Sequence, residues 1–214
     1  MRTETNTIEI YKFDELSYDV QSKVIETWRY DDHFYFGEEW QATLKEFQKL
    51  FDFVNVKNWR VDYYSGYISA SIDDEKIDYS YSDEQPLQGV RLWKWLVNNN
   101  YHVIDQYSKL VEKDQYKKAS YGRIITRTTK PLLVSDYENC PLSGVCCDYN
   151  ILEPLAKFLK KPDVNHTIES LFIECLEAWV DGYQKEFEYW LSEECIKEDI
   201  SYNEHEFLID GSIA

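Results

Sequence analysis

Apolar side chains recur at helical spacing in two segments near the start of the chain. Val20, Val24 and Trp28 follow one another every four residues, which places them on one face of an α-helix. Ser17 is a good N-cap for this helix, and an acidic residue in the first turn favours the positive end of the helix dipole. A second helix is predicted over residues 38–51, and its apolar stripe consists of Trp40, Leu44, Phe47 and Phe51. The chain therefore opens with helices within residues 17–51.

The period changes to two between residues 56 and 82, where tyrosine is frequent. Apolar and aromatic side chains alternate in three short runs, which are Trp59, Val61, Tyr63; then Ile68, Ala70, Ile72; then Ile77, Tyr79, Tyr81. Turn-like breaks at Ser65-Gly66 and at residues 73–75 separate the runs, so the pattern predicts an antiparallel three-stranded meander. The tyrosines of this sheet form a candidate partner-binding surface: Tyr63, Tyr67, Tyr79 and Tyr81. The alternative is an ordinary half-buried sheet without a binding role.

Helical periodicity returns over residues 87–200. The predicted helices span residues 89–99, 103–117, about 148–161 and 167–197. The last is the longest pattern in the chain, and Gly182 within it permits close packing or a bend. Residues 121–131 are compatible with a short strand or a loop. The order of helices, sheet and helices predicts a single α+β domain over residues 1–214, with the helices packed against one face of the sheet.

Composition narrows the range of partners. The chain has 214 residues, a net charge of −17 and 16% aromatic residues, too many aromatics for a disordered acidic chain. Residues 13–86 carry a net −10, residues 87–166 a net +4 and residues 167–214 a net −11. A protein this acidic is expected to bind nucleic acid poorly, because binding requires Lys and Arg side chains that neutralise the phosphates. A protein with a basic surface is the expected partner, although acidity that serves only solubility is the alternative.

The start of the chain, MRTETNTIEIYKF, has no apolar signal segment, and no run of 18 apolar residues predicts a membrane span. We therefore expect a cytoplasmic protein without a membrane partner. Five cysteines in such a protein are expected to be free thiols or metal ligands rather than a disulfide framework.

Three cysteines cluster in the stretch NCPLSGVCCDYN, namely Cys140, Cys146 and Cys147. A zinc knuckle needs a second, similarly spaced pair, and Cys175 and Cys195 do not supply one. A reactive thiol is a second reading, because the cluster directly precedes a predicted helix N-terminus. A buried turn with free thiols is the third reading and the one we favour, so we expect no metal and no cofactor.

Recognisable enzyme motifs are missing from the sequence. The chain has no Gly-rich phosphate loop, no GxSxG and no HExxH. Its 40 acidic residues make every candidate acid–base pair indistinguishable from chance. We therefore expect a protein that is not an enzyme.

Acidic residues on the long predicted helix form the most specific candidate site. Glu174, Glu177, Asp181 and Glu188 fall on one helical stripe opposite most of the apolar face. Glu193 and Glu194 continue the negative run. Carboxylates one turn apart are separated by about 5 Å along the axis, so mimicry of a phosphate backbone requires contributions from alternate turns or neighbouring elements. The alternative is an ordinary solvated helix face.

Three segments together resemble one known group of proteins. They are YKFDELSYDVQSKVIETWR, NCPLSGVCCDYNILEPL and NEHEFLIDGSI. They are similar to a family of small acidic proteins of phages, prophages and conjugative elements of Gram-positive bacteria, some of which are loosely labelled antitoxins. Ser143 stands where the family usually has Thr, and the Cys146-Cys147 doublet is not a family feature.

The resemblance implies an accessory protein of a mobile element. Acidic proteins of this kind include inhibitors of host defence, among them anti-CRISPR proteins that prevent a type II effector nuclease from loading DNA. An inhibitor of this class, acting by protein–protein binding, is the function that the resemblance implies. The alternative is an antitoxin that neutralises a toxin by direct binding.

Overall fold

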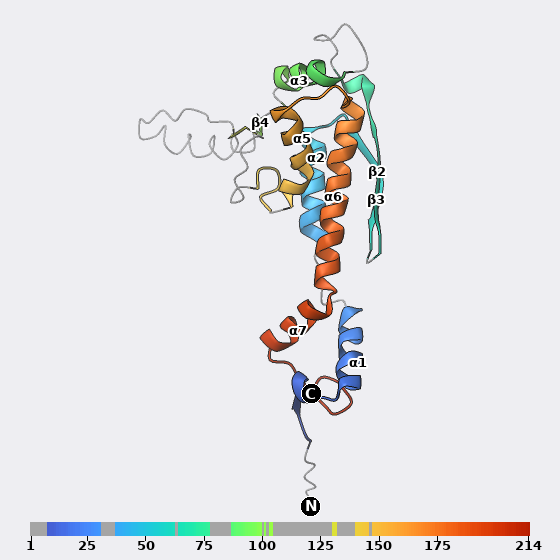
Figure 1. The fold of residues 1–214 in the computed structure, drawn as a ribbon, viewed down its shortest axis with the longest axis vertical. Coiled ribbons are helices and arrows are strands. Elements are labelled where there is room, and N and C mark those ends of the chain that lie inside the picture. Colours follow the sequence, from blue (N-terminus) through green and yellow to red (C-terminus); the bar gives the residue numbers. More distant parts are fainter. Residues whose placement is uncertain are drawn as a thin grey trace, which may run out of the picture. The chain divides into compact units, whose positions relative to one another are not determined.

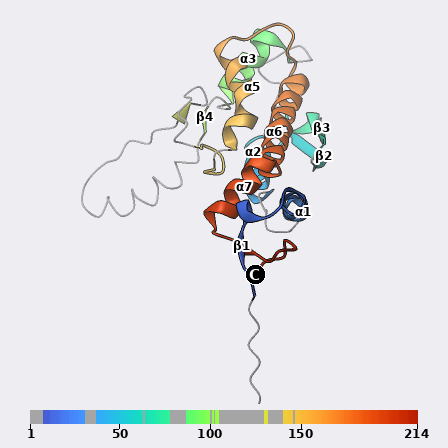
Figure 2. The ribbon, with the colours of Figure 1, turned by 60° about the horizontal axis from the view of Figure 1, so that its bottom comes forward.

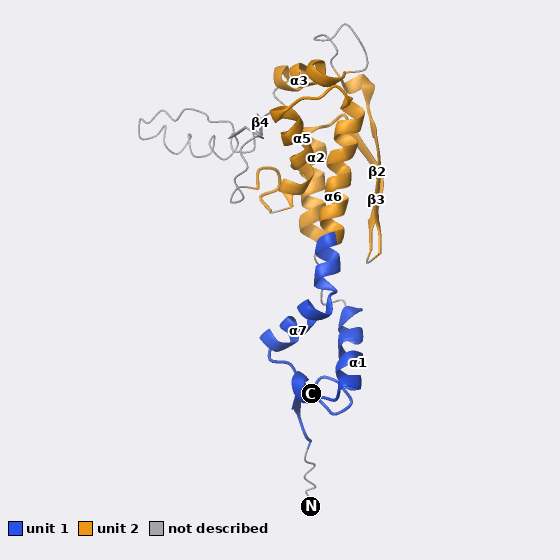
Figure 3. Cartoon of the chain, viewed as in Figure 1, with its two compact units in different colours: residues 1–36, 185–214 blue, residues 37–184 orange. Residues whose placement is uncertain are grey.

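The computed structural model describes residues 8–30, 37–62, 64–77, 87–99, 101, 103–104, 130–131, 140–145 and 147–214. Helices and small two-stranded antiparallel sheets share this part of the chain (Figure 1), which confirms the α+β class. The chain divides into two compact units, coloured separately in Figure 3. Unit 1 comprises residues 1–36 and 185–214, and unit 2 comprises residues 37–184. The expected single domain stays a prediction.

Unit 2 is organised around α6 (Ile168–Trp190), of which residues 185–190 are grouped with unit 1. Trp179 on α6 contacts Trp40 of α2 (Gly37–Leu50), with ring centroids 6.2 Å apart. It also contacts Trp59 of β2 (Val54–Val61) at 5.2 Å. α6 therefore packs against both α2 and the hairpin that β2 forms with β3 (Gly66–Ile72), and the hairpin runs alongside α6 in Figure 1 and Figure 2.

An aromatic core fills the rest of unit 2. Phe51 and Phe53 lie where α2 leads into β2. Their ring centroids are 4.8 Å and 4.9 Å from that of Phe172 on α6. Trp95 of α3 (Gly89–Asn98) lies 5.7 Å from Phe53. α5 (Asp148–Lys160) contributes Leu155, which is fully buried. Burying such large side chains is the main force that holds this unit together.

Unit 1 is smaller. α1 (Tyr18–Arg29) and α7 (Glu193–Tyr202) pack together beside a two-stranded sheet of β1 (Tyr11–Lys12) and β6 (Glu206–Phe207). A 3-10 turn, η1 (Phe13–Glu15), joins β1 to α1. The core of the unit consists of Leu16, Val24, Ile25, Trp28, Ile196, Ile200 and Phe207. All but Leu16, which precedes α1, and Phe207, which lies on β6, are apolar positions at helical spacing on α1 and α7.

The predicted three-stranded meander is wrong. β2 and β3 form a two-stranded hairpin, and the chain after β3 turns into a short 3-10 helix, η2 (Asp74–Lys76). Asp73 caps η2 by accepting a hydrogen bond from the backbone N–H of Glu75 at 3.2 Å. Of the third predicted run, Ile77 is buried after this turn, whereas Tyr79 and Tyr81 lie outside the described residues.

The single helix predicted over residues 167–197 is also wrong. α6 ends at Trp190, and Ser192 begins a new helix by accepting a hydrogen bond from the backbone N–H of Cys195 at 3.2 Å. The helix predicted to start at Val103 fails at its beginning, because β4 (Val103–Ile104) pairs with β5 (Lys130–Pro131). Residues 105–117 lie outside the described part. The predicted helices at the start of the chain, at residues 89–99 and after Asp148 are confirmed.

Candidate partner-binding surfaces

The acidic stripe of α6 is exposed. Glu174, Glu177 and Asp181 in unit 2 all face solvent, because the positions between them are buried. Those buried positions include Cys175, Leu176, Trp179 and Val180. Glu188, on the part of α6 grouped with unit 1, is exposed as well. The predicted exposure of the four carboxylates is confirmed, and whether they bind a partner stays a prediction.

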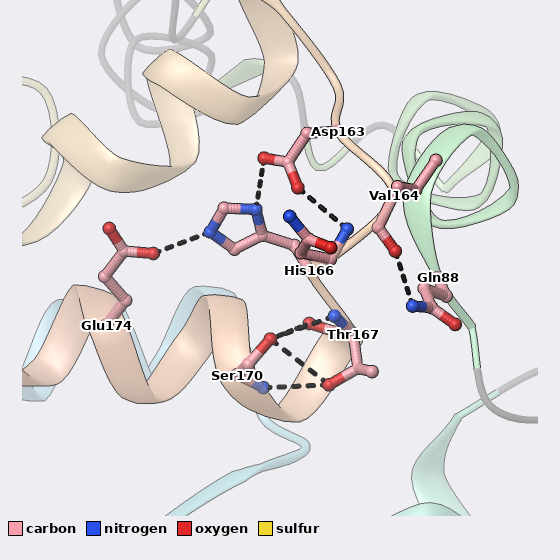
Figure 4. A network of polar contacts seen from close by, with 8 residues as sticks. Gln88, Asp163, Val164, His166, Thr167, Ser170 and Glu174 are labelled. Atoms are coloured by element: carbon pink, nitrogen blue, oxygen red, sulfur yellow. Dashed lines mark hydrogen bonds and ion pairs between the residues drawn. The ribbon is translucent and has the colours of Figure 1, made fainter.

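Glu174 differs from the other members of the stripe because it is tied to a histidine (Figure 4). The His166 ring has Nε2 2.8 Å from a Glu174 carboxylate oxygen and Nδ1 2.6 Å from an Asp163 oxygen. Burial opposes the charged ring, but the hydrogen bonds and charges of the two carboxylates outweigh it and raise the pKa of His166. A protonated His166 therefore offsets part of the charge of Glu174. No motif in the sequence predicts this contact between His166 and Glu174.

Further hydrogen bonds hold the start of α6 in place (Figure 4). Thr167 and Ser170 cap it reciprocally: the Thr167 hydroxyl oxygen accepts from the Ser170 backbone N–H at 3.1 Å, and the Ser170 hydroxyl oxygen accepts from the Thr167 backbone N–H at 2.9 Å. The side-chain amide of Gln88 donates to the Val164 carbonyl. This end of the helix is a structural junction, and its polar groups are used within the protein.

α7 presents a second acidic surface. Glu194, Glu198 and Tyr202 recur every four residues, and all three are exposed, Tyr202 to 87%. Cys195, Ile196 and Ile200, on the opposite side of the helix, are buried in unit 1. No ion pair involves Glu194 or Glu198 in the described part of the chain. Their charges are therefore available to a partner.

Two other carboxylates of α7 are used internally. Glu193 lies 2.5 Å from the Lys197 ammonium, and this ion pair lowers the pKa of Glu193. Asp199 accepts a hydrogen bond from the indole N–H of Trp28 at 3.1 Å, which joins α7 to α1. Of the two predicted α7 residues, Glu194 is therefore the stronger candidate and Glu193 the weaker.

Unit 1 concentrates the charge of the protein. Its 66 residues include 17 acidic and six basic side chains, a net −11 of the chain's −17. It also carries tyrosines that are at least half exposed, which are Tyr18, Tyr30, Tyr189 and Tyr202. Sequence reasoning missed these tyrosines, although each falls outside the apolar stripe of its helix or follows a helix end. Where tyrosines and carboxylates are exposed together, an arginine of a partner can stack on a tyrosine ring and pair with a neighbouring carboxylate.

The tyrosine surface predicted on the sheet is reduced to one described member. Tyr67 of β3 is 50% exposed and lies opposite Arg60 of β2. Tyr63, Tyr79 and Tyr81 lie outside the described residues. Tyr67 alone does not define a binding surface.

The cysteine-rich stretch is organised by a buried carboxylate. Asp148, the first residue of α5, is fully buried. One of its oxygens accepts hydrogen bonds from the backbone N–H groups of Leu142 at 2.6 Å and Ser143 at 2.8 Å. The other accepts from the hydroxyls of Ser143 at 2.5 Å and Thr43 at 2.8 Å. The stretch is therefore a turn that folds around Asp148 and is anchored to α2.

The thiols themselves are arranged as parts of the core. Cys147 and Cys175 are buried, Cys140 is partly buried, and Cys146 lies outside the described residues. Burial raises the pKa of the Cys175 thiol well above its usual value, which removes its reactivity as a thiolate. Across the described ranges, no group of three His, Cys, Asp or Glu side chains is placed to hold a metal ion. The expectation of no metal and no cofactor stays a prediction.

None of the helices in the described part is both long and apolar enough to cross a membrane. Comparisons with protein-family models, with curated proteins and with solved structures gave no match. The resemblance to acidic mobile-element proteins therefore stays a prediction, and any function rests on the surfaces described above.

Proposed function

We propose that this protein is a non-enzymatic inhibitor that binds a basic, nucleic-acid-handling host defence protein through the acidic surface of unit 1. In its most specific version, the proposal is an anti-CRISPR protein that prevents a type II effector nuclease from loading DNA. The choice of a CRISPR nuclease rests on the family resemblance alone. The choice of a basic partner rests on charge and exposure.

The observation that supports a basic partner is the concentration of charge in unit 1. A net −11 over 66 residues destabilises a small unit through self-repulsion. A basic partner would relieve this repulsion on binding. The exposed row of Glu194, Glu198 and Tyr202 on α7 offers two carboxylates and an aromatic ring at intervals of about 6 Å along the helix. Arginine side chains of a nucleic-acid groove are suited to this combination.

The inhibition would be competitive. A groove that holds DNA presents Lys and Arg side chains to the phosphates. Carboxylates of a bound protein that form ion pairs with those side chains would exclude the nucleic acid. Long-range attraction between the two proteins would speed their encounter, and salt would screen it, with a Debye length of about 8 Å at 0.15 M and about 3 Å at 1 M. Raising the salt concentration should therefore slow association more than it speeds dissociation.

The decisive test compares variants that change the charge equally at different places. Glu194→Gln/Glu198→Gln removes the available carboxylates of α7, and Glu177→Gln/Asp181→Asn removes those of the α6 stripe. Glu38→Gln/Glu39→Gln, at exposed positions in the first turn of α2, is the matched control. Each double variant should remain folded, because exposed substitutions usually change stability by less than about 0.5 kcal/mol.

Inhibition of DNA loading by a purified type II effector nuclease is the readout. At about 0.5 kcal/mol for each exposed pair, the α7 double variant should inhibit about five-fold more weakly, and the α2 control should be unchanged. Equal potency of all three variants would exclude a local acidic site. No binding to any type II effector, together with co-purification of a toxin from host lysate, would instead support the antitoxin.

A further inference from the structure

The hairpin in unit 2 has two edges that differ in chemistry. Across the described part of the chain, β2 and β3 pair only with each other, so each strand has an outer row of backbone groups that no other described strand pairs with. β2 has a register shift between Val56 and Asn58, with the charged Lys57 at that point. A bulge and a lysine are typical ways of protecting an edge from pairing. β3, with the sequence GYISASI, has no bulge, no proline and no charged residue.

The register shows which groups of β3 face the open edge. The backbone N–H of Asp73 donates to the Phe53 carbonyl, and that of Asp62 donates to the Ser65 carbonyl, so hydrogen-bonded pairs flank the hairpin at both ends. Hydrogen-bonded and non-hydrogen-bonded pairs alternate along an antiparallel ladder. The backbone groups of alternate β3 residues therefore point away from β2, which are Gly66, Ile68, Ala70 and Ile72.

Packing against α6 holds β3 in its extended conformation before any other strand binds. Its inner face packs on α6, and Gly66 approaches α6 so closely that a Cβ there would collide with Val180. Trp59, opposite Ile68 in the hairpin, is fixed between Trp179 and Tyr183 of the same helix. Little conformational entropy would be lost when another strand pairs with this edge.

We propose that β3 pairs with the β3 strand of a second copy of this chain, antiparallel and centred on Ser69. This register satisfies the outward backbone groups with about eight hydrogen bonds. It also sets large side chains opposite small ones on both faces. Ile68 lies opposite Ala70 and Ile72 opposite Gly66 on the inner face, whereas Tyr67 lies opposite Ser71 on the outer face. The strand is thus complementary to itself under a two-fold axis, as a dimer interface requires.

Charge supports a second copy as the occupant. Two chains of net charge −17 repel each other, so a surface that joins them must exclude carboxylates. The strands of the hairpin contain no acidic residue, and their two charged residues, Lys57 and Arg60, are basic and lie on β2. The β3 edge is therefore a place where two copies approach with little repulsion. This proposal does not depend on the host partner proposed above.

The oligomeric state tests the proposal directly. Sedimentation of the full chain at about 100 µM should show a dimer, because an interface with a Kd in the micromolar range is largely occupied at that concentration. Ser69→Glu places two like charges opposite each other on the axis and should weaken the dimer about five-fold. Asn58→Glu adds the same charge on the same face of β2, paired with Ser69 but away from the open edge, and should remain dimeric.

A cross-linking experiment fixes the register. The central pair of the proposed ladder is non-hydrogen-bonded and separates its Cα atoms by about 4.5 Å, within the range of about 4.4–6.8 Å that a disulfide spans. Ser69→Cys should therefore form a covalent dimer on mild oxidation, whereas Asn58→Cys and the unmodified chain should not. A wild-type monomer at about 100 µM, or a Ser69→Glu variant that dimerises like wild type, would overturn the proposal.

Discussion

Replacement of Asp148 by alanine should be among the most destabilising single changes in the protein. The carboxylate is fully buried and accepts hydrogen bonds from the backbone of Leu142 and Ser143 and from the hydroxyls of Ser143 and Thr43. Alanine removes every one of these bonds at once. The donors remain in the protein, and those of Leu142 and Thr43 are themselves buried.

The magnitude follows from the groups left without a partner. A buried donor that loses its acceptor costs about 1–3 kcal/mol. The backbone N–H of Leu142 loses its acceptor here, whereas the Thr43 hydroxyl still has the Ser143 hydroxyl 3.1 Å away. The Asp148→Ala variant should therefore lose about 2–4 kcal/mol of unfolding free energy, from the unpaired Leu142 N–H and from the lost hydrogen bonds of Ser143 and Thr43 to a charged group. Thr43→Val removes the hydrogen bond to the Asp148 carboxylate and the contact with the Ser143 hydroxyl, and should cost about 1.5–3 kcal/mol. Asp148→Asn keeps one accepting oxygen and should lie between wild type and alanine.

Urea unfolding followed by circular dichroism measures these differences. Asp181→Asn, at an exposed position on α6, makes the same chemical change without a buried network and should remain within about 0.5 kcal/mol of wild type. A second readout is local. Cys147 lies directly before Asp148 and is buried, so release of the turn should make its thiol react faster with an alkylating reagent in the native protein.

Two results would refute this reasoning. An Asp148→Ala variant within about 1 kcal/mol of wild type would show that the donors find other partners at little cost. A large loss of stability with unchanged protection of Cys147 would show that the carboxylate supports α5 or α2 but does not hold the turn. A double variant of Thr43→Val with Asp148→Asn measures how strongly the two side chains are coupled.

Other regions of the structure lead to further expected outcomes. Gly182→Ala should cost about 1–3 kcal/mol by urea unfolding, because a Cβ there would lie 2.6 Å from Trp40 and 2.8 Å from Asn150; wild-type stability would mean that the helices separate freely. The raised pKa of His166 means that its ion pairs contribute fully below about pH 6.5, its ordinary value, and that this contribution is lost as pH rises through the folded-state pKa. His166→Gln should remove this part of the pH dependence of unfolding, and parallel stability–pH profiles for the two proteins would contradict it. Thiol titration should find five free cysteines after denaturation without reductant, and stable disulfides would refute this.

Much of the local structure follows from the order of residues. The four-residue recurrence of Val20, Val24 and Trp28 predicts α1 and the face that it buries. The alternation from Trp59 to Ile72 predicts the β2–β3 hairpin. The predicted break at Ser65-Gly66 lies slightly too late, because Gly66 already pairs with Val61 and the connection runs from Asp62 to Ser65. The exposure of the carboxylates on α6 follows from the same periodicity. These features depend on side chains within a few positions of one another, where spacing and backbone geometry are sufficient.

Two errors came from weighing a long pattern above a local signal. In the sequence, the apolar spacing of α6 continues to residue 197, but Ser192 followed by two glutamates is a helix N-terminus, and α7 begins there. Asp73 likewise caps η2 in place of a turn into a third strand. Both caps are readable in the sequence, and periodicity concealed them.

Tertiary structure alone decided how distant residues meet. Thr43 contacts Asp148 across 105 positions of sequence, and Trp28 contacts Asp199 across 171. His166 and Glu174 are only eight residues apart, yet their pairing depends on how the chain turns into α6. The same folding gathers both ends of the chain into unit 1 and so concentrates its charge there. Hydrophobic burial is non-directional; periodicity therefore tells which side chains are buried, whereas their partners depend on the packing of the whole chain.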